Sequence, residues 1–438
     1  MRHLRLFWDV LRTSLWFVPS LFVLGSILLA QGMIELDHLL SIDELEESWP
    51  RIFAVGPAGA RSVLATTAGS MISIAGVAFS ITIVALTLAS SQYTSRILRN
   101  FMRDRANQSV LGAFVGIFVY CLWILRTISE GEAYSFVPVG AVLFAVVLAL
   151  VGIACLIFFI HHIAKSIQAE QIILAATAET LASVDRLFPE HVGEPAEDDP
   201  PPLPREDTTW HAIPANRTGY LQSVDGNGLV DYASEHGCVI RMECPVGRFN
   251  IEGSPLVSLG DTGEPDEDVR KQILGYFKIG GERTLVQDAS YGIRQIVDVA
   301  LKALSPGIND TTTAVSCVQN LTAVIARIAE RRMPEDYRVE DGQVRFIAAR
   351  LGFGDLLGDA FDQIRQNAGG NVATLEALVA GLTTIAERTS DPERHGVIAE
   401  QLDLVKAKAD ATIEQAEDCA AIDEAVSALR QRLAGRSD

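Results

Sequence analysis

The sequence predicts an α-helical membrane domain with four transmembrane helices, followed by an α+β cytosolic domain that combines a small β barrel- or sandwich-like part with a helical part. Three features predict it: four apolar runs before residue 161, a proline-rich acidic break at 189–206, and short alternating strands that give way to helical periodicity. The expected divisions are a four-helix transmembrane domain (1–165), a helical extension with the linker (166–206), a β-rich subdomain (207–285) and a mostly helical domain (286–438).

The four apolar runs cover residues 13–34, 66–91, 110–125 and 134–160. A helix needs about 20 apolar residues to cross a bilayer, and the run at 110–125 reaches that length when it extends through Ile128. The first run follows three arginines, as a secretory signal does. Leu28 occupies a position where a cleavage site needs a small residue, so we expect a retained helix.

Charge predicts the orientation of the four spans. Residues 1–13 and the loop 92–109 carry net charges of +2 and +3, whereas the loops 34–62 and 127–137 carry −4 and −2. Because basic loops stay in the cytoplasm, we expect both termini there. Residues 1–160 hold equal numbers of acidic and basic side chains, so the net charge of −19 lies on the remainder. A cytosolic domain this acidic argues against nucleic acid as a partner.

The second run is the most informative segment of the chain. Gly, Ala, Ser and Thr fill 16 of the 26 positions in residues 66–91. Its hydroxyl residues fall on one narrow stripe of a helix, with two valines in the gaps. Unsatisfied polar groups are costly in hydrocarbon, so we expect this face to meet protein or water rather than lipid. The stripe is Thr66, Ser70, Ser73, Val77, Ser80, Val84, Thr87 and Ser91.

Three interpretations of this stripe remain open. Small residues allow helices to pack closely, with hydroxyls bonded across helices or back to carbonyls. In an oligomer, the same residues could instead line a permeation path, or they could form a groove for a lipid or small ligand. The apolar runs hold no Asp, Glu, Lys or Arg, which argues against a proton relay. Arg96, Arg99 and Arg103 share one helical face, and either set the topology or form an anion-attracting cytosolic mouth.

The cytosolic part begins with a helical pattern that continues from the last span to about Leu187. Short strands are expected between 212 and 259, and a hairpin at 337–347 turns at Asp341-Gly342. The remaining segments predict helices at 291–304, 311–331, 354–366, 372–389 and, as one long amphipathic helix, 393–433.

A polar corner lies between two of these helices. Pro306 and Gly307 end one helix, and Asn309 or Asp310 can cap the next. The simpler interpretation is a tight turn between helices; the alternative is a site for an ion or small ligand. Gln287, Asp288 and Asp298, one helix upstream, could converge on this corner. The candidate residues are Gln287, Asp288, Asp298, Ser305, Asn309, Asp310 and Thr311.

Signals of catalysis are weak. The chain has no nucleophile elbow, P-loop, zinc-protease motif or dinucleotide fingerprint, so we expect no enzyme and no cofactor. His161 and His162 are adjacent, and a helix would point them in different directions, so we expect no metal site there. The six cysteines form no Cys-x-x-Cys pair and are expected to be free thiols.

Two segments carry a resemblance to a known family. The run Gln287–Gln295, followed by 297–313, is similar to the signature of a large group of predicted bacterial membrane proteins, domain of unknown function 2254. The end of the second run, Ser90-Ser91-Gln92-Tyr93, fits the same pattern. The resemblance extends over nearly the whole chain. It implies a bacterial inner-membrane protein, and it implies no particular activity.

Two functional hypotheses follow. The first is a homo-oligomeric, channel-like or transport protein, in which the second span lines the path and the cytosolic domain gates or assembles it. The second is a membrane-anchored scaffold or sensor, whose cytosolic domain binds a protein or small ligand near Asp310. In both, the lipid bilayer is a partner.

Overall fold

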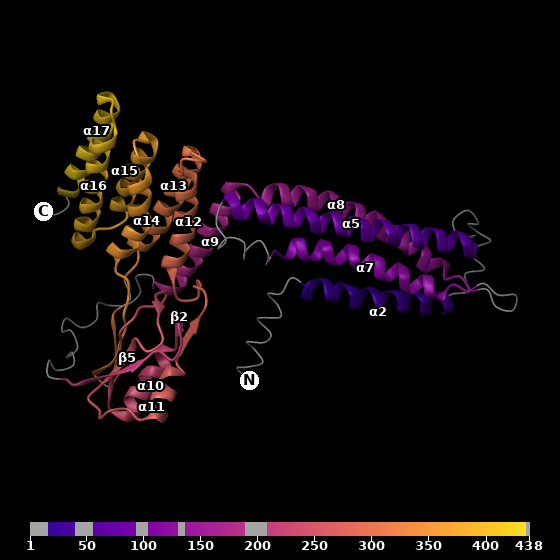
Figure 1. Cartoon of the computed structure of the whole chain (residues 1–438), viewed down its shortest axis with the longest axis horizontal. Coiled ribbons are helices and arrows are strands. Elements are labelled where there is room, and N and C mark those ends of the chain that lie inside the picture. The colour runs from indigo at the N-terminus through magenta and orange to yellow at the C-terminus, as the bar shows by residue number, and fades with distance from the viewer. Residues whose placement is uncertain are drawn as a thin grey trace. The chain divides into compact units, whose positions relative to one another are not determined.

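The computed structural model describes residues 16–39, 56–92, 104–129, 136–188, 208–333, 335–340 and 342–434. The chain divides into two compact units, residues 1–171 and 172–438. We call them the membrane unit and the C-terminal unit (Figure 1).

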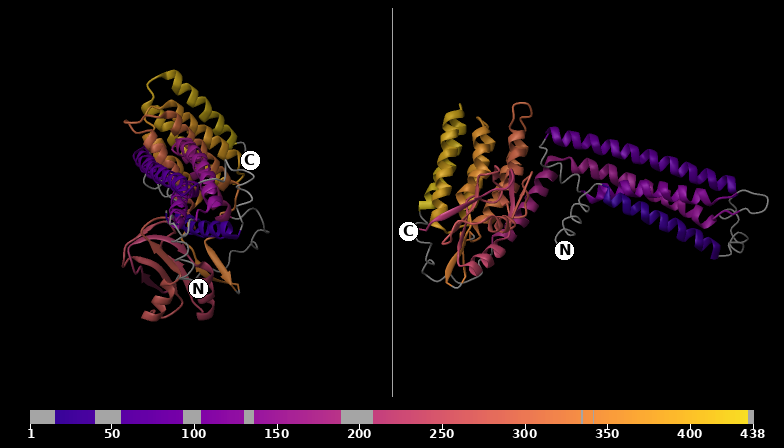
Figure 2. Two further views of the ribbon diagram at one scale, coloured as in Figure 1. Left: turned by 90° about the vertical axis from the view of Figure 1, so that its right-hand side faces the viewer. Right: turned by 60° about the horizontal axis from the view of Figure 1, so that its bottom comes forward.

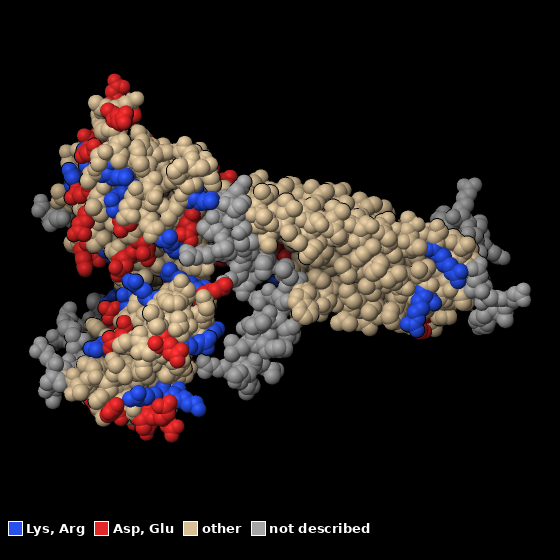
Figure 3. Space-filling model, viewed as in Figure 1, with Lys and Arg blue, Asp and Glu red and all other residues tan. Residues whose placement is uncertain are grey.

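Four helices of the membrane unit are long and apolar enough to cross a membrane. They are α2 (Phe17–Leu39), α5 (Pro57–Gln92), α7 (Arg105–Thr127) and α8 (Val139–Ser166). This confirms four candidate spans near the N-terminus. Charged side chains are sparse on the face of this unit seen in Figure 3, as expected for a surface in contact with lipid.

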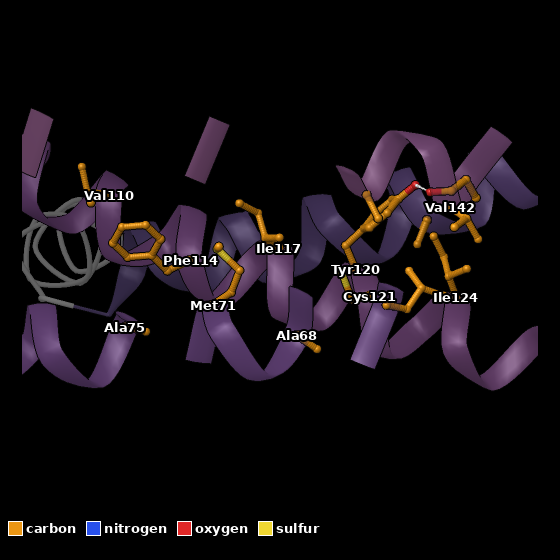
Figure 4. Close-up of a cluster of buried hydrophobic side chains, with 14 of the residues drawn as sticks. Ala68, Met71, Ala75, Val110, Phe114, Ile117, Tyr120, Cys121, Ile124 and Val142 are labelled. Carbon is orange, nitrogen blue, oxygen red and sulfur yellow. Dashed lines mark hydrogen bonds between the residues drawn. The ribbon is translucent and has the colours of Figure 1, made fainter. Parts of the chain in front are cut away.

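Helix α7 is the centre of the bundle and packs against α2, α5 and α8. Its glycines allow the closest contact: a Cβ at Gly112 would lie 2.8 Å from Phe22, and one at Gly116 would lie 2.7 Å from Ser26. This is the small-residue packing typical of membrane helices. The buried face of α7 carries Phe114 and Tyr120 (Figure 4). The Tyr120 hydroxyl donates to the carbonyl of Ala141 at 3.0 Å, which connects α7 to α8.

The structure corrects the prediction that no acidic residue lies in a span. Helix α2 continues to Leu39 instead of ending at Ile34, and so includes Glu35 and Asp37. The Asp37 carboxylate is buried and accepts the backbone N–H of Ala141 at 2.9 Å, near the start of α8. A carboxylate is favourable there because the first N–H groups of a helix lack partners. An apolar pattern cannot reveal such a pairing between distant segments.

A second correction concerns the end of the last span. The helical pattern to Leu187 was expected to continue α8, but α8 ends at Ser166 and α9 (Ala169–Leu187) is a separate helix. A tight turn joins them, in which the N–H of Gln168 donates to the carbonyl of Lys165 at 3.2 Å. From Ile172 onward, α9 belongs to the C-terminal unit.

The C-terminal unit contains two sheets. A five-stranded sheet has the order β1-β5-β3-β8-β7, and a three-stranded sheet has the order β4-β2-β6. All pairs are antiparallel except β3 with β8. The elements are β1 (Trp210–Pro214), β2 (Gly219–Val224), α10 (Gly226–His236), β3 (Val239–Met242), β4 (Phe249–Asn250), β5 (Pro255–Gly260), α11 (Glu267–Leu274), β6 (Phe277–Gly280), β7 (Tyr337–Glu340) and β8 (Gln343–Ile347).

The predicted strands and the predicted hairpin of β7 and β8 are therefore present, but the sheets do not close into a barrel. In the described part of the chain, each sheet keeps two open edges. The five-stranded sheet stays open because of a pairing between distant segments. Strand β8 comes from a hairpin far along the chain and pairs in parallel with β3, so it extends the sheet instead of closing it. Their shared core includes Ile240, Leu256 and Phe346.

Six helices complete the unit and pack side by side (Figure 2). They are α12 (Ala289–Ala303), α13 (Thr311–Ala329), α14 (Phe353–Asn367), α15 (Val372–Glu387), α16 (Pro392–Thr412) and α17 (Ala416–Ala434). The prediction of one long helix over 393–433 is wrong, because Ile413 has an extended backbone (φ −91°, ψ 123°). Helix α17 contacts both α15 and α16, and Lys406 pairs with Asp423 across the turn at 2.8 Å.

Candidate functional site

The hydroxyl stripe lies on the outward face of α5. From Thr66 to Thr87 all of its side chains are exposed, and Val77 and Val84 are both 58% exposed. The side chain of Ser91 lies outside the described residues. The opposite face of α5 is buried in the bundle against α7 and α8; it consists of Ala60, Leu64, Ala68, Met71, Ala75, Ala78 and Ala85. No helix of the same chain covers the stripe in the described ranges.

The hydroxyls of the stripe bond to their own helix. Ser73 donates to the carbonyl of Gly69 at 2.8 Å, Ser80 to Gly76 at 3.0 Å and Thr87 to Ile83 at 2.9 Å. These are the i−4 bonds that Ser and Thr form in helices. Such hydroxyls need neither water nor a second helix, so polarity alone does not decide what this face meets.

The size of the side chains distinguishes α5 from its neighbours. The outward face of α8 carries large aliphatic side chains, such as Leu150 (63% exposed) and Ile157 (66%). The outward face of α5 instead carries the stripe together with Gly69 and Gly76, and a Cβ at either glycine would have no neighbour within 4 Å. These exposed glycines leave room for another backbone to approach α5 closely, as Gly25 and Gly32 do on α2.

The predicted cytosolic mouth, Arg96, Arg99 and Arg103, lies outside the described residues. The described residue that follows is Asp104, which caps α7 by accepting the N–H of Ala106 at 2.9 Å. Its carboxylate also contacts His162 of α8. His161 is exposed on α8, apart from this contact. In the described ranges, no three or more His, Cys, Asp or Glu side chains are arranged to hold a metal ion.

The structure does not bring the predicted polar corner together. Gln287 and Asp288 precede α12, whereas 305–311 follow its other end. A helix of 15 residues is about 22 Å long, so the two groups lie far apart. Asp298 lies between them and pairs with Arg294 at 2.8 Å. The expected convergence is wrong because both groups border one helix, which keeps its ends apart.

The corner itself is built as a helix cap. Asp310 accepts the backbone N–H of Thr313 at 3.0 Å and its hydroxyl at 2.6 Å. These bonds stabilise the carboxylate and lower the pKa of Asp310. Asn309 adopts the left-handed conformation (φ 50°), and the Thr311 hydroxyl accepts from the side chain of Asn371, the cap of α15, at 2.6 Å. Most of its polar groups therefore already have structural partners.

Asp288 lies in a second polar cluster, at the start of α12. It is 4% exposed, and Arg283 donates to both carboxylate oxygens, at 2.8 and 2.9 Å. It also caps α12 by accepting the N–H of Tyr291 at 3.0 Å. Beside it, Gln287 exchanges two hydrogen bonds with the backbone of Val224, at 2.8 and 3.0 Å, which fixes the end of β2.

Gln287 and Asp288 line a cavity of about 480 Å³ in the C-terminal unit. The ends of α9, β2 and β8 and the start of α10 and α12 meet around it. Three arginines of its lining were not predicted as site residues: Arg186, Arg338 and Arg350. They come from three separate segments, and no local motif marks them. Only the fold could bring them together.

The architecture and these sites define a class: a helical membrane protein with four candidate spans and a mixed α and β C-terminal unit. The comparisons agree with this class. Residues 12–384 match the family model described as predicted membrane protein (DUF2254), and the chain belongs to this family. An uncharacterized protein of Mycobacterium tuberculosis strain CDC 1551 is 35% identical over 410 residues, which cover 91% of this chain and 76% of the relative. An uncharacterized protein of Mycobacterium bovis has the same identity and coverage. No solved structure matches the chain.

Proposed function

We propose that this protein is a homo-oligomeric, channel-like or transport protein of the inner membrane, in which α5 of each copy faces a shared axis. One observation carries the proposal: the outward face of α5 bears a stripe of short hydroxyl residues with Gly69 and Gly76 beside it, next to exposed large side chains such as Phe79. A lipid-facing surface usually carries large aliphatics, as the outward face of α8 does. Small residues instead favour close contact between helices or a narrow lining.

The path would be uncharged along α5, because from Thr66 to Leu88 this helix carries no ionisable side chain. Selectivity would then depend on the width of the path, on the Val77 and Val84 constrictions, and on Arg96, Arg99 and Arg103 at a cytosolic mouth. The distribution of Lys and Arg between loops supports cytoplasmic termini. The C-terminal unit would gate the path or assemble the oligomer.

Flux through liposomes that contain the purified full chain tests the proposal. We expect Ser73→Leu and Ser80→Leu to lower flux and to change the oligomer size, because a large side chain blocks both close packing and a narrow lining. Ala154→Leu is the matched control: Ala154 is exposed on the outward face of α8, where neighbouring side chains are already large. If the full chain carries no flux of any ion at any voltage or membrane tension, the channel hypothesis is excluded.

Loss of yield alone in the α5 variants, with no change in flux, would indicate that the stripe only packs helices. Thiol-reactive probes on single cysteine replacements along the stripe provide an independent measurement. A path predicts labelling from water, whereas uniform protection in every condition contradicts a path.

A second candidate is a membrane-anchored scaffold or sensor. The cavity beside Asp288 favours it, because its volume is in the range of small-molecule sites. In this alternative the spans anchor the C-terminal unit, and ligand binding there is the function. Ligand-dependent thermal stabilisation of the full chain, without any flux, would support it.

A further inference from the structure

The cavity beside Asp288 contains cationic groups without a carboxylate partner. Neither Arg338, on β7, nor Arg350, after β8, forms an ion pair or a hydrogen bond with another side chain in the described part of the chain. Partial desolvation and the nearby Arg338 lower the pKa of Arg350, and Asp336 opposes this effect. Arg338 and Arg350, both exposed to solvent, therefore lie near each other, and the nearby Asp336 offsets only part of their charge without pairing directly with either.

The third arginine is held in place by the backbone. Arg186 donates to the carbonyls of Leu285 and Val286, at 3.0 and 3.3 Å. Carbonyl oxygens orient a guanidinium but do not neutralise it. A planar, permanently charged group fixed in this way is suited to binding a carboxylate or phosphate.

The two acids of the lining do not compensate these charges. Asp288 is already paired with Arg283 through both of its oxygens. Asp225 directs its carboxylate to the backbone of α10, where it accepts the N–H of Gly228 at 3.2 Å. The rest of the lining is largely apolar and includes Phe188, Met242, Phe346, Leu351 and Leu356. Charge and shape together suit a molecule with an anionic head and an apolar body.

We propose that this cavity binds a small organic anion, with its phosphate or carboxylate between Arg338 and Arg350 and its apolar part against Phe346 and Leu356. The inference rests on the sensor alternative and does not require a path along α5. Because Arg186 and Leu187 form the end of α9 and Phe188 follows them, a bound anion would contact this helix. Arg331 secures the same end of α9 by pairing with Asp185 at 2.6 Å.

Calorimetric titration of the full chain in zwitterionic nanodiscs tests the assignment. The probes are inorganic phosphate, uridine monophosphate against uridine, and octanoate against octanol. We expect at least one anion to bind, with its uncharged counterpart about tenfold weaker or worse. Arg338→Gln and Arg350→Gln should each weaken binding about tenfold, since each removes a charge-assisted hydrogen bond. Repeating the titration with anionic lipid distinguishes the sources: competition by the lipid identifies a headgroup as the natural anion, and unchanged binding identifies a soluble one.

The matched control is Arg332→Gln, because Arg332 is exposed, pairs with Glu335 at 3.2 Å and lies outside the cavity. Its binding should equal that of the unmodified chain. Equal binding of uridine and its monophosphate, or of octanol and octanoate, would overturn the anion assignment and leave the sensor alternative standing. Unchanged binding in Arg338→Gln and Arg350→Gln would likewise overturn the assignment. If none of these compounds binds, the assignment fails, whereas the scaffold or sensor alternative, which allows a protein partner, still stands.

Discussion

Two glycines in the loops between strands share a backbone conformation but differ in what surrounds them. Gly247 has φ +90° and Gly253 has φ +87°, both in the left-handed region. A Cβ at Gly247 would lie 2.3 Å from the Asp288 carboxylate, whereas one at Gly253 would meet nothing within 4 Å. At Gly247 a side chain is therefore disfavoured both by the backbone conformation and by the nearby Asp288. At Gly253 it is disfavoured by the backbone conformation alone.

Gly247→Ala should accordingly be more harmful than Gly253→Ala. We expect Gly253→Ala to lower the free energy of unfolding by about 1–2 kcal/mol, from backbone strain alone. Gly247→Ala should cost about 2 kcal/mol more, because it also displaces the Asp288–Arg283 pair. Thermal unfolding of the purified full chain measures both variants. Equal losses would contradict the close contact between Gly247 and Asp288.

At the scale of an element, the start of α13 depends on one carboxylate. Asp310 accepts two hydrogen bonds from Thr313, and these lower its pKa below the ordinary 3.8. Asp310→Ala should lower the free energy of unfolding by about 1 kcal/mol, as is usual for loss of a cap, and Asp310→Asn by less. A ligand site at the corner would predict a different result, with unchanged stability and lost binding.

The same cap predicts a pH dependence. The folded state holds the Asp310 proton less tightly than the unfolded chain does, so the ionised cap stabilises the fold above pH 3.8. This contribution is lost as the pH falls through the lower folded-state pKa. The stability difference between the unmodified chain and Asp310→Ala should therefore narrow below pH 3.8. A constant difference across this range, measured by thermal unfolding, would contradict an ionised cap.

Elements differ in how far local sequence predicts them. The hairpin of β7 and β8 was predicted, and the predicted cap at Asn309 or Asp310 is made by Asp310, because both features depend on residues a few positions apart. The sequence showed that one face of α5 is unusual. Only the positions of α7 and α8 show that this face points away from the bundle. The break between α16 and α17 at Ile413 was not predicted, because the Ala-rich pattern continues through it. The chain turns there so that α17 can pack against α15 and α16, which the local sequence does not show.

For the whole molecule, the two units have separate cores and different charge. The membrane unit has an apolar core around α7, and the net negative charge lies on the remainder of the chain. Acidic and basic side chains are accordingly dense on the visible face of the C-terminal unit (Figure 3). Such a unit has the composition of an independently folding domain.

A fragment of residues 169–434 should therefore fold without detergent. It retains α9, both sheets and all six C-terminal helices, so no core of this unit is interrupted. We expect a soluble fragment with one cooperative thermal transition, within a few degrees of the corresponding transition of the full chain. Circular dichroism and gel filtration check this. Aggregation, or a non-cooperative transition, would show that this unit depends on the membrane unit.

From the sequence alone one could determine the four spans, the acidic second half, the family and the local caps and turns. Each depends on composition or on neighbours within a few residues, where hydrophobicity and hydrogen bonding act directly. Tertiary structure decided the rest: that Asp37 caps α8, that the stripe of α5 faces outward, and that Arg338 and Arg350 share a cavity with Asp288. These pairings join segments distant in the chain. They depend on how whole elements pack, and no local pattern of residues encodes that.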